Sequence, residues 1–304
     1  MSRQQRRPRP ARQTQPSQPF SGAARDELRR TGDPRLEHAL TTVLAEAGLP
    51  VATPEPSDHI VLLRGVPVVP GMRLSPPTLL WDVWLSRLQA LFLAWRGAGP
   101  IDSEDPALRA QWERWCAEHV HFVTVRRISA GVAWLRSFLA QPAPASGQGD
   151  GERGHVHLIG HSSGGAAALS YLVGVRACQQ PEPLMPVRAV MTLDAAIAGL
   201  AGRWSGAKSY LRRVADDGLN GLNRWASTHG VTLLTVANER DIWSHRVLGD
   251  VPYLGLRVGP PFALRLQLNG NIHERLRDMP EIVAALWGMP SPPVSRDTGA
   301  LVLR

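Results

Sequence analysis

HVHLIGHSSGGAAALSYLVG, residues 155–174, combines a short apolar run, a glycine-rich turn and a run of small apolar residues. The apolar run predicts a strand over 155–159, and the residues after the turn predict a helix over 165–177. The turn itself, GHSSG over 160–164, fits the pattern G-x-S-x-G. Glycines are needed on both sides of the serine because side chains there would collide across so tight a turn. We therefore expect Ser162 to stand above a sheet edge, at a helix N-terminus that favours developing negative charge.

Strand and helix patterns alternate along most of the chain. Short apolar runs predict strands at 60–63 with an extension over 66–69, and at 120–125, 155–159, 188–193, 231–236, 253–258 and 264–268. Apolar residues at helical spacing predict helices that begin at Pro34 and that span 78–96, 128–140, 165–177 and 280–287. This alternation is typical of an α/β fold with a mostly parallel central sheet covered by helices on both faces.

Composition divides the chain into one domain and two tails. Residues 1–33 are rich in Arg, Pro and Gln and poor in aliphatic side chains, so we expect a disordered basic tail. A single α/β domain is expected over 34–290, followed by a C-terminal tail over 291–304. Within the domain, the insert 195–230 is either a crossover helix or a cap over an apolar acyl pocket.

The net charge of +8 suggests at first a nucleic-acid-binding protein. Residues 1–30, however, hold eight arginines and two acidic residues, so they carry +6 of that charge and the other 274 residues carry only +2. The charge is therefore mostly a property of the tail, which can touch acidic surfaces through salt-sensitive contacts. We expect no nucleic acid to bind the folded domain.

Several other classes of protein are excluded by what the sequence lacks. The two cysteines, Cys116 and Cys178, are too few for a disulfide framework and do not fit a zinc pattern. No run of about 18 apolar residues predicts a transmembrane helix, and the N-terminal stretch has no apolar core typical of a signal peptide. We expect a cytoplasmic protein without a cofactor, and no metal site at Asp241 and His245, which lie four residues apart.

Three stretches resemble the α/β-hydrolase superfamily, and its lipases and esterases in particular. LIGHSSGG (158–165) is similar to the nucleophile elbow of bacterial lipases. VRAVMTLDAAIAG (187–199) lies where such lipases have a strand and a short loop to the lid region. HERLRDMPEIVAALWG (273–288) is similar to the segment that begins at the histidine before their last helix. The resemblance implies a catalytic triad in the chain order serine, acid, histidine.

The nucleophile of this triad is Ser162, whose hydroxyl needs a base within hydrogen-bond distance. Of the ten histidines, only His245 and His273 follow the elbow and both candidate acids. We favour His273 as the base because it follows a predicted strand and precedes the last helix. His245 is the weaker alternative.

Two aspartates are candidates for the acid that orients the base. Asp194 and Asp241 each follow the carboxyl end of a predicted strand, where the catalytic groups of open α/β sheets gather. The loop around Asp241 resembles the loop that carries the acid in many family members, so we favour Asp241 and keep Asp194 as the alternative. Glu239 is close enough in sequence to replace Asp241.

The resemblance also implies an oxyanion hole made of two backbone amides. One is the N–H of Ser163, the residue after the nucleophile, and the other comes from the loop after an earlier strand. Lipases often have His-Gly in that loop, whereas this chain has Arg64-Gly65, with Gly71 as the alternative position.

These residues predict a serine hydrolase that cleaves carboxylic esters with apolar acyl groups, on a small-molecule or lipid substrate, through an acyl-enzyme intermediate. An acyltransferase or thioesterase would use the same triad. A non-catalytic α/β-hydrolase binding module is a third alternative, which the replacement of His-Gly by Arg64-Gly65 favours. A phosphate-binding loop is disfavoured because the turn has neither the spacing nor the lysine of a P-loop.

Overall fold

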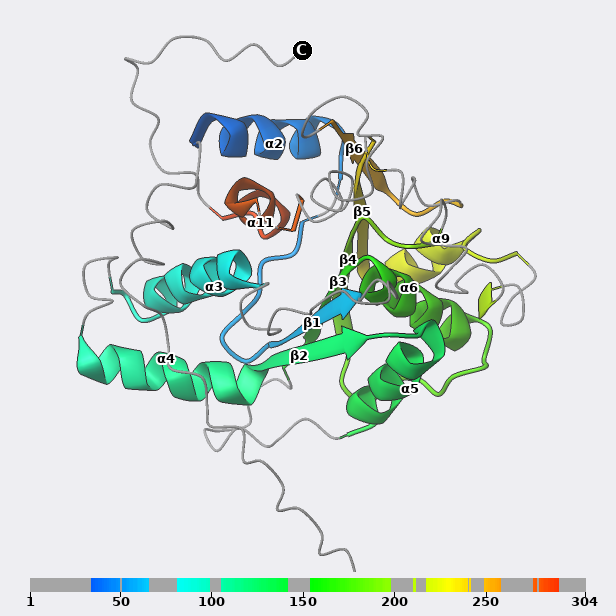
Figure 1. Ribbon diagram of the computed structural model, residues 1–304, viewed down its shortest axis with the longest axis horizontal. Helices are drawn as coiled ribbons and strands as arrows, with labels where there is room; N and C mark the ends of the chain where they lie inside the picture. The colour runs from blue at the N-terminus through cyan, green and yellow to red at the C-terminus, as the bar shows by residue number, and fades with distance from the viewer. Residues whose placement is uncertain are drawn as a thin grey trace, which may run out of the picture. The chain divides into compact units, whose positions relative to one another are not determined.

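Six parallel strands form the centre of the fold in the computed structural model (Figure 1). They are β1 (His59–Gly65), β2 (Val120–Val125), β3 (Val156–His161), β4 (Val187–Leu193), β5 (Thr232–Asn238) and β6 (Tyr253–Leu256). The structure describes residues 34–49, 51–65, 81–98, 105–141, 154–197, 210–211, 217–239, 241, 249–257, 276–277 and 279–289. The predicted mostly parallel sheet is confirmed.

The strand order, β2-β1-β3-β4-β5-β6, reverses once. From β1 the chain moves to β2 on one side, returns to β3 on the other side of β1, and then continues outward through β4, β5 and β6. In open α/β sheets, ligands bind outside the carboxyl ends of the strands at the point where the order reverses. Here that point is the carboxyl end of β1 and β3, where the G-x-S-x-G turn lies.

Helices cover both faces of the sheet, as the sequence predicts. On one face α5 (Ile128–Leu139), α6 (Ser163–Arg176) and α9 (Leu222–Thr228) form a continuous apolar core with the strands. On the other side lie α2 (Pro34–Glu46), α3 (Asp82–Trp95) and α11 (Pro280–Leu286) (Figure 1). All seven residues of β1 are buried although their side chains alternate between the faces, so neither face of this strand contacts solvent.

One helix has only a weak signal in the sequence. Helix α4 (Pro106–His119) places only two apolar side chains, Trp112 and Trp115, in the core, so its helical periodicity is weak in the sequence. Its start was nonetheless signalled, because the Asp105 side chain accepts a hydrogen bond from the Ala107 amide and Pro106 occupies the first turn. No helix in the part of the chain that the structure describes is both long and apolar enough to cross a membrane.

Several predicted segments lie outside the described residues. These are the tails 1–33 and 291–304, the strand 264–268, the extension 66–69 and two parts of the insert 195–230, namely residues 198–209 and 212–216. The crossover and cap interpretations of that insert therefore stay open, although α9 forms its last part.

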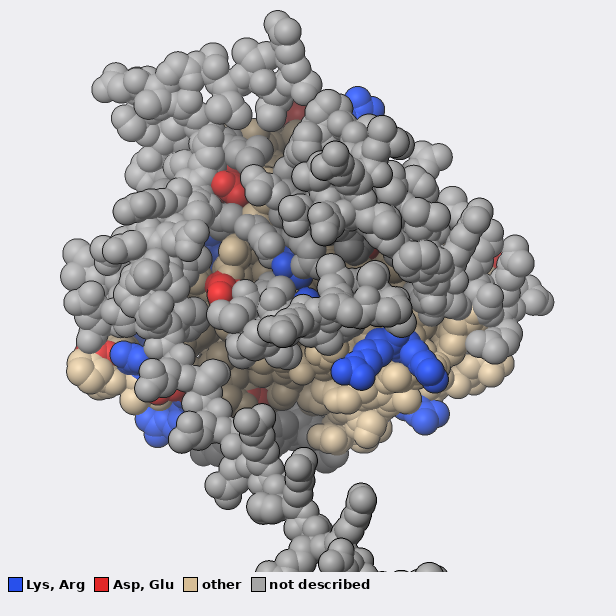
Figure 2. All heavy atoms as spheres, viewed as in Figure 1, with Lys and Arg blue, Asp and Glu red and all other residues tan. Residues whose placement is uncertain are grey.

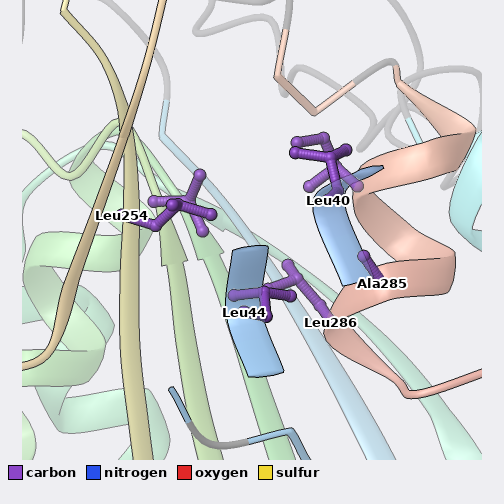
Figure 3. A pocket seen from close by; sticks show the side chains of 7 residues that line it. Leu40, Leu44, Leu254, Ala285 and Leu286 are labelled. Atoms are coloured by element: carbon purple, nitrogen blue, oxygen red, sulfur yellow. The ribbon is translucent and has the colours of Figure 1, made fainter. Parts of the chain in front are cut away.

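A small apolar pocket lies where α2 and α11 pack against β5 and β6 (Figure 3). Every lining residue is aliphatic: Leu40, Leu44, Val236, Leu254, Ile282, Ala285 and Leu286. A ligand site normally adds a few polar groups that orient the ligand. The pocket lining has none, so we interpret it as the packing interface that holds α2 to the rest of the domain.

At the amino ends of the strands, opposite the G-x-S-x-G turn, a buried carboxylate holds several segments together. Asp58 accepts hydrogen bonds at 2.9 Å from the amides of Glu55 and His155 and from the ring of His157. Burial alone would raise the pKa of Asp58, but these hydrogen bonds outweigh it and hold the pKa below its ordinary value. The ionised carboxylate thus joins the loop before β1 to the start of β3.

Three histidines pack beside Asp58 as neutral rings. His59 lies 4.9 Å from His119 between ring centroids, and His59 Nδ1 and His121 Nε2 share a hydrogen bond at 3.2 Å. Burial lowers the pKa of all three, and repulsion between neighbouring rings adds to the effect on His59 and His121. The pKa of His121 falls to about 4. A proton on both His59 and His121 would also break their shared hydrogen bond, because one ring nitrogen must accept it.

We predict that acid destabilises the fold through these rings. Because their pKa values are lowered in the folded state, the unfolded chain takes up protons first as the pH falls below 6.5, and stability is lost until the folded pKa is passed, about 4 for His121. His121→Phe should reduce the loss between pH 7 and 4.5 by on the order of 2 kcal/mol. Urea unfolding at each pH measures this. His38→Gln, at an exposed position on α2, is the control, and an unchanged pH profile in His121→Phe would contradict the prediction.

Candidate active site

Ser162 occupies a strained turn between β3 and α6. Its backbone has φ 58° and ψ −126°, a conformation that costs a residue with a side chain on the order of 1–3 kcal/mol. Three hydrogen bonds hold it there: its amide donates to Leu193 O at 3.0 Å, and its carbonyl accepts from the amides of Ala166 at 3.1 Å and Ala196 at 2.9 Å. The surrounding structure therefore fixes the serine in a position that it would not adopt alone.

The two glycines of G-x-S-x-G are sterically required. A Cβ on Gly160 would stand 2.5 Å from Gly165 Cα, and a Cβ on Gly164 would stand 2.1 Å from Leu63 O. Both contacts are with backbone atoms, which cannot rotate away as a flexible side chain can. Any side chain at these two positions would therefore collide, as the sequence predicts. The glycines allow the start of α6 to lie directly against β1 and β3.

Gly65, the last residue of β1, touches the same turn. A Cβ at this position would lie 2.3 Å from Ser163 N and 2.8 Å from Ser162 Cβ. The carboxyl ends of β1 and β3 therefore meet at the predicted nucleophile and the predicted oxyanion donor. Gly71, the alternative position, lies outside the described residues.

Asp194 directly follows β4 and lies beside the elbow, because the Ser162 amide is bonded to the carbonyl of the preceding residue, Leu193. It is fully buried and has a positive φ of 47°. Its Oδ1 accepts a hydrogen bond from the Asn238 amide at 2.7 Å, and its own amide donates to Val236 O at 2.9 Å. These bonds hold the carboxylate between the ends of β4 and β5.

Asp241 follows β5 and is buried as well. Its amide donates to Asn238 O at 2.9 Å, so Asn238 contacts both candidate acids through its backbone. Glu239 differs from both aspartates, since it is exposed and pairs with Arg257 at 2.7 Å. The sequence does not single out Asn238, which lies two residues beyond the predicted strand 231–236 and is the last residue of β5.

The predicted base cannot be placed. His273 and its alternative His245 both lie outside the described residues. Among the described residues, Ser162, Ser163, Gly65 and Asp194 meet at the turn, and Asp241 lies at the same edge of the sheet, after β5.

Two further side chains beside the elbow are buried. His161, which precedes Ser162, is fully buried. Arg64 is only 7% exposed and pairs in register with His161. The sequence did not reveal that this arginine is buried, because arginine is rarely found in a core.

A metal site is not indicated in the described part of the chain. No group of three or more His, Cys, Asp or Glu side chains there is arranged to hold a metal ion.

Exposed arginines are visible on the surface where Figure 1 draws β2 and α5 (Figure 2). Arg126 and Arg127, in the turn between these elements, are exposed.

The chain matches no protein-family model, and no curated protein is significantly similar to it in sequence. The α/β class therefore follows from the sheet and its helices, and the chemistry of the site has to be argued from the geometry of the elbow.

We predict that the elbow tolerates no side chain at position 164. Gly164→Ala should lower the free energy of unfolding by about 2–4 kcal/mol, because the new methyl group collides with the Leu63 carbonyl. Gly174→Ala, in the same helix α6, is the matched control. There the methyl group would lie 2.7 Å from Gln180 Cγ, a side-chain atom that can move aside, so stability should stay within about 1 kcal/mol of the parent. Equal losses in the two variants, measured by urea unfolding, would contradict the steric account.

Proposed function

We propose that this protein is a serine hydrolase that cleaves carboxylic esters with apolar acyl groups, as lipases and esterases of the α/β-hydrolase superfamily do. The observation that carries the proposal is the backbone of Ser162, held at φ 58° between β3 and α6 where the strand order reverses. Strain of this kind in a non-glycine residue concentrates at functional sites. A serine that only closed a strand-to-helix turn would not need it.

The surroundings of Ser162 suit a nucleophile that generates an oxyanion. Ser162 is the N-cap of α6, and the first amides of a helix have no acceptor within the helix. These N–H groups and the helix dipole favour negative charge at this place. The close approach of Gly65 adds the end of β1 to the same small volume.

The reaction would proceed in two halves. Ser162 Oγ attacks the ester carbonyl carbon while the base, which we assign to His273, takes the hydroxyl proton. The tetrahedral intermediate collapses, the C–O bond to the alcohol breaks, and the alcohol leaves with that proton. Water then attacks the acyl-enzyme with help from the same base, which releases the carboxylic acid and restores Ser162.

The acid is assigned to Asp241, with Asp194 as the alternative. Both are buried, and both form a hydrogen bond with the backbone of Asn238 at the end of β5. Burial keeps water from competing for the carboxylate, which suits a group that must orient an imidazole. Asp194 has the shorter connection to the elbow, through Leu193.

We expect a fluorophosphonate probe to label the wild-type protein once, on Ser162, and to leave Ser162→Ala unlabelled. The variant should also lose hydrolysis of p-nitrophenyl butyrate by at least about a thousandfold, because it has no nucleophile. Mass spectrometry of the labelled peptide locates the adduct. A folded wild-type protein that resists the probe would indicate the non-catalytic binding module instead.

The acid assignment predicts different effects for two matched variants. Asp241→Asn should lower kcat by about 10³–10⁴-fold with little effect on KM, since an amide cannot hold the base in the required tautomer. Asp194→Asn should lower the free energy of unfolding and have a smaller effect on kcat than Asp241→Asn, because the Asp194 carboxylate joins β4 to β5. If the kinetic losses are reversed between the two variants, Asp194 is the acid.

A further inference from the structure

The side chain of Ser163 makes a hydrogen bond that the triad does not explain. Its Oγ donates to the carbonyl of Val125 at 3.2 Å, and Ser163 is buried. Val125 is the last residue of β2, and it lies opposite Gly65 in the β1–β2 register. The hydrogen bond therefore runs from the turn after β3 to the end of β2, past the end of β1.

This hydrogen bond depends on the absence of a side chain at position 65. A Cβ on Gly65 would lie 2.5 Å from Ser163 Oγ and 2.3 Å from Ser163 N. The missing side chain thus makes room for both the hydroxyl and the amide of the same residue. Three strand ends and the start of α6 converge on these two atoms.

An amide that stabilises an oxyanion must be aimed before the reaction begins. Its nitrogen should lie about 2.7–3.1 Å from the position that the oxyanion will occupy. Misplacement by about 1 Å can slow an enzyme by about a hundredfold. Ser163 N is the predicted donor, and only Cα and Cβ separate it from the hydroxyl that is anchored on β2.

We propose that Ser163 is a positioning residue, whose hydroxyl anchors the start of α6 to β2 and thereby aims its own amide at the oxyanion. The inference rests on the proposed function, and it assigns a role to the side chain of a residue whose backbone alone was expected to act. The anchor acts on the transition state, because the oxyanion exists only there. Substrate binding should be nearly independent of it.

The test measures kcat and KM for p-nitrophenyl butyrate in four proteins, alongside their urea unfolding. Ser163→Ala should lower kcat by about 10- to 100-fold and leave KM within about twofold. Ser163→Thr keeps the hydroxyl and should retain most of the wild-type kcat. Ser170→Ala is the matched control, because Ser170 is buried in the same helix but its Oγ makes no hydrogen bond in the described structure.

One further variant and two outcomes distinguish a failure of the positioning role from a failure of the proposed function. Ser163→Cys keeps the size of the side chain but donates only weakly, so it should also lose kcat, which covers the case in which the alanine variant does not fold. If Ser162 is labelled and Ser163→Ala or Ser163→Cys keeps the wild-type kcat, the positioning role is overturned and the hydrolase remains. If the folded wild-type protein is neither labelled nor active, both proposals are overturned.

Discussion

The structure depends on one steric constraint: the carboxyl ends of β1 and β3 and the start of α6 can meet only where side chains are absent. Gly65, Gly160 and Gly164 each lie so close to neighbouring atoms that a Cβ would come within 2.5 Å of one of them. The close approach places Ser162 in its strained turn. Backbone hydrogen bonds from β4 and α6 then keep the serine there.

The topology places these glycines at the point where the strand order reverses. The strand order reverses between β1 and β3, so the connections that leave these strands diverge, and in open α/β sheets ligands bind at such a point. The same edge receives Asp194 from β4 and Asp241 from the residues after β5. Residues from four separate segments of the chain thus lie at the carboxyl ends of the strands.

The two edges of the sheet use polar groups differently. At the amino edge, Asp58 has three hydrogen-bond donors around its carboxylate, and the adjoining histidines are kept neutral by burial. These groups join loops to strands. At the carboxyl edge, hydrogen bonds join Asp194 and Asp241 to Asn238, and Ser162 to Leu193.

Much of the fold could be read from local pattern. The strand and helix on either side of Ser162 were predicted because apolar runs and small residues mark them, and strands such as β4 and β5 followed for the same reason. Helix α4 has a weak pattern, because only two of its side chains, Trp112 and Trp115, are buried. The collisions at Gly160 and Gly164 were also predictable, because the tightness of the turn is a local property.

By itself, the sequence determined the α/β class and the tight, glycine-flanked turn at Ser162, because these depend on neighbours along the chain. Only the tertiary structure decided that Gly65 meets Ser163, that Ser163 Oγ bonds to Val125, and that Asn238 contacts both aspartates. These contacts join residues that lie between 3 and nearly 100 positions apart. The register of parallel strands sets such contacts, and register is fixed by the packing of the whole sheet, not by any single segment.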